Sequence, residues 1–308
     1  MCIRDRLLRD LNISVFLFFV FTVAVFQVND HQIGGKNDKK GQLQEIAGFI
    51  LVDRDIRIKE YFQYIDSIVS DLNDRHSYKI SEHVLVRHNP WVIDSLANTD
   101  YYRMIEKDTF VYDQKEMLVL RQHDTIYVPD STQIATLENK FKKTQIDINI
   151  PEYKLRIYED SLKTYEFSVR VGRNESKYLE MAGRIESLKT KTGKGTIVKH
   201  VRDPDYYNPV NGHQYHLTNR DDNKTTKLPQ IPFIETEINE IRNGQLIHPT
   251  TNPVTLGKAY SNGCIGTKES DAWIIYYYAP IGTEINIRYD LHVLDENGVS
   301  ITLKDIYH

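Results

Sequence analysis

The sequence predicts a mainly β fold of the sandwich type over residues 145–290, with one helix over residues 268–278. Hydrophobic and polar residues alternate over residues 146–150, 155–158 and 165–171, which is the period of strands with one buried face. Turn-forming residues separate these runs. Short strands in succession favour a β-sandwich or a curved sheet over a parallel α/β fold.

A smaller accessory region of mixed helix and strand is expected over residues 43–144. Apolar residues recur at three-to-four spacing from Ile58 to Leu72, which indicates an amphipathic helix. Asn89-Pro90 offers a cap and a first-turn proline for a second helix. Asp130 and Ser131 can cap a third helix that runs through Lys143.

Short strands are expected over residues 109–128. The stretch from Leu120 to Pro129 resembles the end of a LysM-like wall-binding repeat over about ten residues. That resemblance implies a degenerate LysM-like module, and an ordinary mixed α/β region is the alternative. Residues 291–308 are expected to form a C-terminal extension.

The N-terminus carries the pattern of an export signal over residues 1–29. Arg4, Arg6 and Arg9 precede an apolar run from Ile13 to Phe26. The run is shorter than the roughly 20 residues of a spanning helix, so cleavage is favoured. We expect an exported protein of the periplasm or cell envelope, and an uncleaved membrane anchor over residues 7–29 is the alternative.

Residues 30–42 are polar and read as a linker. The six opening residues resemble translated sequencing adapter, in which case Cys2 is not a lipidation site. The net charge of −4 gives no indication of a nucleic-acid partner. Cys264 is then the only cysteine of the exported part, and a single cysteine in an oxidising compartment suggests a purpose.

Two segments carry candidate chemistry, residues 245–253 with His248 and residues 257–266 with Cys264. A thiol is a useful nucleophile as its thiolate, so it needs a base or a positive neighbour. A loop of sixteen residues can bring the imidazole beside the sulfur. The alternative is a buried, inert cysteine.

A helix is expected just after Cys264, with Thr267 as its N-cap and Glu269 in its first turn. The positive end of that helix would lower the pKa of the thiol. Gly263 permits a tight turn that exposes neighbouring N–H groups. These are expected to form an oxyanion hole.

The pattern His, loop, Ser261-x-Gly-Cys-Ile, helix and then residues 279–285 resembles the L,D-transpeptidase catalytic domain (YkuD-like). Thr190-Lys191-Thr192-Gly193 resembles a second stretch of that family. The resemblance covers about residues 146–289. It implies a β-rich catalytic fold and peptidoglycan stem peptides as substrate.

The resemblance also implies roles for individual residues. Cys264 would attack the carbonyl after the L-centre of a diamino acid, release D-Ala and pass the acyl group to an amine. His248 would be the general base, Ser261 a motif serine, and Gly263 with Cys264 the oxyanion-hole amides. The carbonyl of Pro249 would orient the His248 ring. No metal or cofactor is expected, and a β-lactam of the carbapenem class is a candidate covalent inhibitor.

The chain departs from the family pattern at two positions. Asn262 stands where the family usually has His, and Gly266 stands where it usually has Arg or Asn. Asn262 cannot act as an acid or base, and Gly266 removes a fixed cation. The nucleophile and base are untouched.

Several alternatives remain open from the residues alone. The acyl acceptor can be water, which gives an L,D-carboxypeptidase, or the site can have decayed in a wall-binding protein. Arg202, Tyr206 and Tyr207 either line the substrate groove or belong to an ordinary loop. His213 and His216 are expected in a surface loop and not in a metal site. Residues 220–224 are expected to be a solvated hairpin tip.

Overall fold

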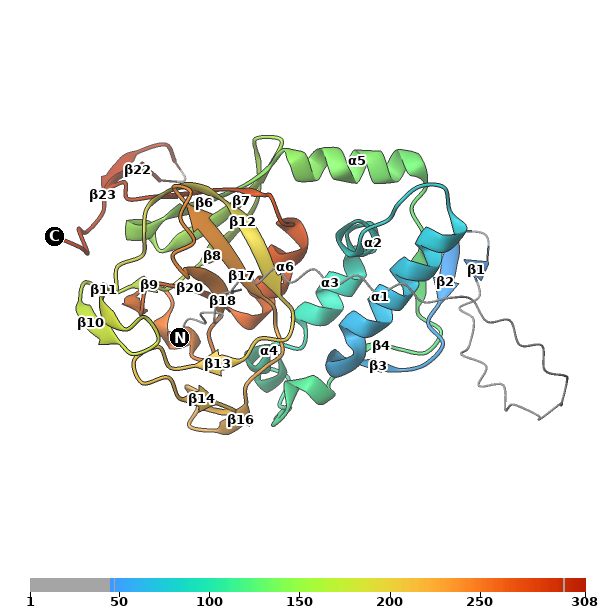
Figure 1. Ribbon diagram of the computed structural model, residues 1–308, viewed down its shortest axis with the longest axis horizontal. Coiled ribbons are helices and arrows are strands. Elements are labelled where there is room, and N and C mark those ends of the chain that lie inside the picture. Colours follow the sequence, from blue (N-terminus) through green and yellow to red (C-terminus); the bar gives the residue numbers. More distant parts are fainter. Residues whose placement is uncertain (1–44, 47, 296) are drawn as a thin grey trace, which may run out of the picture.

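The computed structural model of the chain describes residues 45–46, 48–295 and 297–308 (Figure 1). The expected leader over residues 1–29 and the linker over residues 30–42 therefore lie outside the described residues. Within the part that is described, no helix is both long and apolar enough to cross a membrane.

One mixed sheet of eight strands organises the C-terminal part (Figure 1). In spatial order its strands are β20 (Ile265–Thr267), β18 (Leu246–Pro249), β17 (Phe233–Ile238), β12 (Gly193–Val201), β21 (Glu284–Arg288), β6 (Thr144–Asn149), β7 (Lys154–Glu159) and β8 (Leu162–Ser168). Strands β6, β7 and β8 pair antiparallel through short connections, as the alternating runs predict. Their inward residues belong to the main core, among them Ile146, Ile157 and Phe167.

The two edges of this sheet meet. The chain that leaves β8 reaches β20, where Arg170 N donates to Gly266 O at 2.9 Å and Gly266 N donates to Arg170 O at 3.0 Å. Strand β9 (Val171–Gly172) then pairs in parallel with β19 (Ala259–Ser261). The sheet is thereby nearly closed, and closure satisfies edge groups that would otherwise face solvent.

Short hairpins extend from this sheet. They are β10 (Ser176–Leu179) with β11 (Arg184–Ser187), β13 (Tyr206–Tyr207) with β14 (Gln214–Tyr215), β15 (Leu217–Asn219) with β16 (Thr225–Lys227), and β22 (His292–Leu294) with β23 (Ser300–Thr302). Single 3-10 turns are η1 (Gln114–Glu116), η2 (Ile150–Glu152) and η3 (Pro253–Thr255).

The accessory region is helical with small sheets. Its helices are α1 (Ile58–Arg75), α2 (Glu82–His88), α3 (Pro90–Ala97), α4 (Tyr101–Ile105) and α5 (Ser131–Lys142). Its strands are β1 (Glu45–Ile46), β2 (Phe49–Leu51), β3 (Ile56–Arg57), β4 (Leu118–Leu120) and β5 (Thr125–Tyr127). Local sequence explains the expected starts, because α3 begins on a proline and Asp130 and Gln133 form a capping box for α5.

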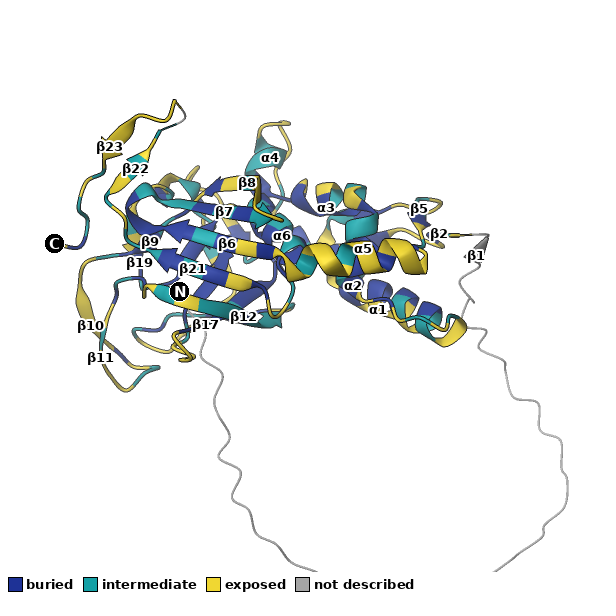
Figure 2. Cartoon of the chain, turned by 90° about the horizontal axis from the view of Figure 1, so that it is seen from above, coloured by how far each residue is buried: buried dark blue, intermediate teal, exposed yellow. Residues whose placement is uncertain are grey.

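Helix α6 (Glu269–Tyr278) joins the two parts. It packs against α2 and α3 on one side and against β18 on the other (Figure 1). Trp273 lies edge-on to Tyr61 of α1, and the hydroxyls of Tyr61 and Tyr277 lie 2.6 Å apart. Buried residues of both parts form one hydrophobic cluster, while α5 is largely exposed (Figure 2). The accessory region thus shares its core with the sheet domain.

The predicted fold class is confirmed: the chain is mainly β, with one helix after Cys264 and a smaller α/β region in front. That helix begins at Glu269, one residue later than expected. The resemblance of residues 120–129 to a LysM-like repeat stays a prediction. These residues include β5, which pairs with β2, and the end of β4, which pairs with β3.

Candidate active site

His248 and Cys264 lie on one face of neighbouring strands. His248 is in β18 and pairs in parallel register with Gly266 of β20. Cys264 immediately precedes β20, two residues before Gly266, so its side chain leaves the strand on the same face. Phe233, the antiparallel neighbour of His248, packs with Cys264 in a small cluster of its own. Sheet register therefore brings the two candidate residues together from sixteen residues apart.

The imidazole of His248 has a defined orientation. Its Nδ1 lies 2.9 Å from the carbonyl oxygen of Pro249, and because a carbonyl can only accept, Nδ1 carries the proton. Nε2 is buried and has no hydrogen-bond partner. The ring also packs against Phe233, with centroids 5.0 Å apart. The expected contact with Pro249 is present and leaves Nε2 as a proton acceptor.

Burial lowers the pKa of His248 well below its usual value, and the positive charge of Arg170 acts in the same direction. The ring is 2% exposed. Water is excluded from the imidazole, so the charged form is poorly solvated. At neutral pH the ring is therefore uncharged, which is the form that can accept a proton.

A tight turn holds Cys264. Gly263 has φ +108°, which a residue with a Cβ rarely adopts. The Ser261 hydroxyl donates to the carbonyl of Cys264 at 2.5 Å and accepts from Gly263 N at 3.2 Å. Ser261 thus fixes the turn. The N–H of Gly263, expected in an oxyanion hole, is already used inside that turn.

A second layer supports this turn. Thr190 Oγ1 donates to the carbonyl of Gly263 at 3.0 Å and accepts from Gly172 N at 2.8 Å. The hydroxyl of Tyr307, in the C-terminal extension, accepts from Thr190 N at 3.0 Å and donates to Gly172 O at 2.7 Å. The end of the chain is thereby tied to the segment that carries Cys264.

Replacing Tyr307 with Phe is expected to destabilise the protein by about 1–3 kcal/mol. The change leaves Thr190 N and Gly172 O buried without a partner, and each then carries an uncompensated desolvation cost. Urea unfolding should show a lower midpoint at an unchanged slope. Tyr178→Phe, at an exposed tyrosine, is the matched control. Equal midpoints for the two variants would contradict the expectation.

Two cavities of about 420 Å³ border the site. The first, here the Cys264 cavity, includes Asn262, Gly263 and Cys264 in its wall. The second, here the His248 cavity, includes Arg170, Tyr206 and His248. The sulfur of Cys264 lies 4.0 Å from Gly244 O, and the residue has 0% accessible surface. A substrate must therefore displace part of the wall of the Cys264 cavity, which includes residues of the β10–β11 hairpin.

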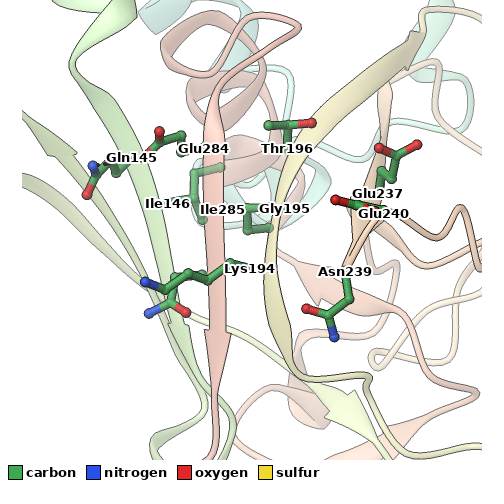
Figure 3. A pocket seen from close by; sticks show the side chains of 11 residues that line it. Gln145, Ile146, Lys194, Gly195, Thr196, Glu237, Asn239, Glu240, Glu284 and Ile285 are labelled. Atoms are coloured by element: carbon green, nitrogen blue, oxygen red, sulfur yellow. Dashed lines mark hydrogen bonds between the residues drawn. The ribbon is translucent and has the colours of Figure 1, made fainter.

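A larger cavity of about 620 Å³ lies over β6, β12 and β21 (Figure 3). Its wall carries Lys194 together with Glu237, Glu240 and Glu284, and it includes neither Cys264 nor His248. It offers mixed surface charge but not the candidate Cys–His pair, so size alone does not make it the active site. Among the described residues, no group of three or more His, Cys, Asp or Glu side chains is arranged to hold a metal ion.

Of the remaining predicted residues, Asn262 and Tyr206 border the two cavities, whereas Tyr207 and Arg202 do not. Asn262 lies in the wall of the Cys264 cavity and accepts a hydrogen bond from Arg173 at 2.7 Å, and Tyr206 lies in the wall of the His248 cavity. Tyr207 is half-buried in the short β13–β14 ladder. Arg202 instead pairs with Asp66 and Glu82 of the accessory region, so it ties the two parts of the chain together.

Two local expectations were wrong. Thr267 is the last residue of β20, and Lys268 occupies the N-cap of α6 without a side-chain cap. Three strand residues and the N-cap Lys268 separate Cys264 from the helix. In the first turn of α6, Ser270 N donates a hydrogen bond to Asp100. The helix dipole acts over about one turn, so it contributes little at the sulfur.

The hairpin tip over residues 220–224 is only partly solvated, contrary to the prediction. Asp221, Asp222 and Asn223 are exposed, but Arg220 is buried against Glu269. Sequence reasoning missed Arg170, Arg173 and Tyr307, because an arginine in an alternating strand and a tyrosine near the chain end look ordinary. The stretch from Thr190 to Gly193 was the one sequence signal that pointed to the surroundings of the Cys264 turn.

Residues 143–287 match the family model of the L,D-transpeptidase catalytic domain, YkuD. No curated protein matches the chain significantly.

The chain is also weakly similar to several solved structures. An L,D-transpeptidase from Mycobacterium smegmatis is 13% identical, with 47% of this chain and 58% of that chain covered and a TM-score of 0.34. L,D-transpeptidase 3 from Mycobacterium tuberculosis, in complex with a faropenem-derived adduct, is 16% identical, with 47% and 60% covered and a TM-score of 0.32. One from Xylanimonas cellulosilytica is 13% identical, with 77% and 97% covered and a TM-score of 0.35.

The chain spans less than two thirds of the first structures it matches. The family assignment therefore rests on the family model, which covers the sheet domain from β6 to β21. Residues 143–287 of this chain are therefore similar to the L,D-transpeptidase catalytic domain family, YkuD.

Proposed function

We propose that this protein is a cysteine acyltransferase that acts on peptidoglycan stem peptides, with Cys264 as nucleophile and His248 as base. The observation that carries the proposal is the orientation of the His248 ring and the nitrogen that it leaves open as a proton acceptor. Its Nδ1–H is held by Pro249, and its buried Nε2 has no partner on the face it shares with Cys264. An oriented, neutral imidazole on the face of a cysteine is what activates a thiol.

The reaction follows from these positions. His248 Nε2 takes the thiol proton, and the sulfur attacks the carbonyl carbon that precedes the terminal D-Ala of a stem tetrapeptide. The C–N bond then breaks, and the imidazolium returns the proton to the leaving amine of D-Ala. An amine acceptor next attacks the thioester and loses a proton to His248. The sulfur leaves as a thiolate, which takes this proton back from the imidazolium and restores the thiol.

The remaining residues have positioning roles in this proposal. Ser261 and Thr190 hold the Cys264 turn in shape. A substrate oxygen can take the N–H of Gly263 by displacing its 3.2 Å contact with Ser261. Asn262, held by Arg173, stands at the Cys264 cavity as a hydrogen-bonding residue without acid–base function.

The leader and cellular location belong to the same proposal. The basic and apolar pattern over residues 1–29 supports export to the periplasm or cell envelope, with residues 7–29 as an anchor if the segment is retained. Peptidoglycan lies in that compartment. Wall-peptide chemistry and an export signal are therefore consistent with each other.

Mass spectrometry tests the reaction. The reduced full chain is incubated with a stem tetrapeptide and a peptide amine, and both protein and products are weighed. We expect a tripeptidyl adduct on the protein, loss of D-Ala and a crosslinked peptide.

Two other outcomes would correct the proposal. Tripeptide without crosslink means that water is the acceptor and the protein is an L,D-carboxypeptidase. If neither the peptide nor a carbapenem adds mass to the reduced wild type, the protein is a decayed wall-binding relative. Cys264→Ala is the control for the site of the adduct.

A further inference from the structure

Arg170 enters the candidate active site from a distant part of the sequence. Its main chain closes the sheet by exchanging two hydrogen bonds with Gly266, the residue beside His248 in the parallel register. A Cβ built on Gly266 would lie 2.5 Å from Arg170 Nε and 2.8 Å from Arg170 Cγ. The guanidinium therefore occupies the space of a side chain at position 266, next to the imidazole.

This placement restores a charge that the local motif lacks. Gly266 stands where an Arg or Asn is usual in the family, so the motif itself supplies no cation there. The absence of a side chain at Gly266 is also what admits Arg170. Arg170 therefore supplies a cation beside a position at which the local motif has none, at the point where the sheet closes.

The charge of Arg170 is poorly compensated. Among the described residues it forms no ion pair with a carboxylate. Its Nε is buried without a hydrogen-bond partner, and its terminal nitrogen reaches Thr255 Oγ1 at 3.4 Å. Burial lowers the pKa of Arg170 to about 10, so the side chain is still charged at neutral pH. A partly desolvated guanidinium facing a cavity is a site for an anion.

The proposed reaction identifies which anion fits. His248 must return a proton to the nitrogen of the departing D-Ala, so that nitrogen lies beside the ring. The carboxylate of D-Ala is only two bonds from the same nitrogen. Arg170 and His248 lie in the wall of one cavity, so a carboxylate that enters this cavity beside the ring can reach the guanidinium.

We propose that Arg170 binds the C-terminal carboxylate of the acyl donor and makes the site selective for peptides that end in a free carboxylate. This inference rests on the proposed function and specifies the leaving-group subsite. The planar guanidinium can bind the two carboxylate oxygens at once, which an ammonium cannot do.

The test compares a stem tetrapeptide with its C-terminal carboxamide. The rate of Cys264 acylation is measured by intact mass on the reduced full chain. Wild type should favour the acid by about 10- to 100-fold, which corresponds to one charge-assisted bidentate contact. Arg170→Gln should reduce that preference to less than about 3-fold, and Arg170→Lys should retain part of it.

Gly266→Ala is the sharpest companion variant. It keeps Arg170 but pushes its side chain aside, so it should lose the same preference without any change of charge. Arg170→Gln and Gly266→Ala both keep the two main-chain hydrogen bonds between positions 170 and 266. Thermal melting checks that these variants fold. Lys258→Gln, which removes an exposed positive charge near the same strand pair, should behave like wild type.

The outcomes separate this inference from the reaction itself. If a carbapenem acylates wild type but acid and carboxamide react equally, the carboxylate subsite is refuted and the acyl-transfer proposal stands. If a carbapenem adds no mass, the acyl-transfer proposal fails. Binding of the two peptides to Cys264→Ala by calorimetry then decides the subsite, and equal affinities that Arg170→Gln leaves unchanged would refute it.

Discussion

Replacing His248 with Ala should slow acylation of Cys264 by about 10²- to 10⁴-fold, the range that a positioned general base contributes. The thiol would lose the buried Nε2 of His248, which lies on its face of the sheet. The rate is measured by intact mass with a carbapenem. His248→Asn, which keeps a polar group near Pro249 but offers no base, should be equally slow. An Ala variant within about threefold of wild type would exclude His248 as the base.

The pH profile gives a second test of the same residue. Burial lowers the pKa of His248, and Arg170 acts in the same direction. The base works in its neutral form, so activity is lost as the pH falls through its pKa. Because that pKa lies below the ordinary value of 6.5, the acidic limb of the acylation rate should lie below pH 6.5. Arg170→Gln should move this limb upward, since a positive neighbour is removed.

Replacing Arg220 with Ala should cost about 3–5 kcal/mol of folding free energy, the expected cost of breaking a buried ion pair. The side chains of Arg220 and Glu269 are each 1% exposed, and their hydrogen bond joins the β15–β16 hairpin to helix α6. Glu269 also accepts from Tyr101 N at 3.1 Å. Without Arg220, a carboxylate remains buried among groups that cannot balance its charge. Urea unfolding measures the loss.

The pH dependence of that loss has a definite sign. Burial already raises the pKa of Glu269, and removal of Arg220 raises it further. A group whose pKa is higher in the folded state stabilises the fold at low pH and loses that contribution as the pH rises through its folded pKa. The cost of Arg220→Ala should therefore be smaller at pH 5 than at pH 8.

A matched double variant supplies the control. Arg220→Met with Glu269→Gln removes both charges, so it should recover much of the stability lost in Arg220→Ala. A single variant that unfolds like wild type at both pH values would show that the pair does not hold the hairpin to α6.

Local sequence determined several elements in both parts of the chain. Alternation placed β6, β7 and β8, and the first-turn proline Pro90 and the N-cap Asp130 placed α3 and α5, because these signals act over a few residues. The His248 and Cys264 motif pointed to two segments that the sheet brings side by side, and the family resemblance, expected over about residues 146–289, is confirmed by the family model at residues 143–287. Their catalytic roles stay predictions.

Only the tertiary structure decided what surrounds this pair. Sheet closure brings Arg170 beside His248 across 78 positions of sequence, which no local period can show. The burial of Arg220 is likewise set by Glu269, a residue of a different element. Hydrophobic periodicity reports which face of an element is buried, whereas the partner of a charged side chain depends on which elements the fold places against each other.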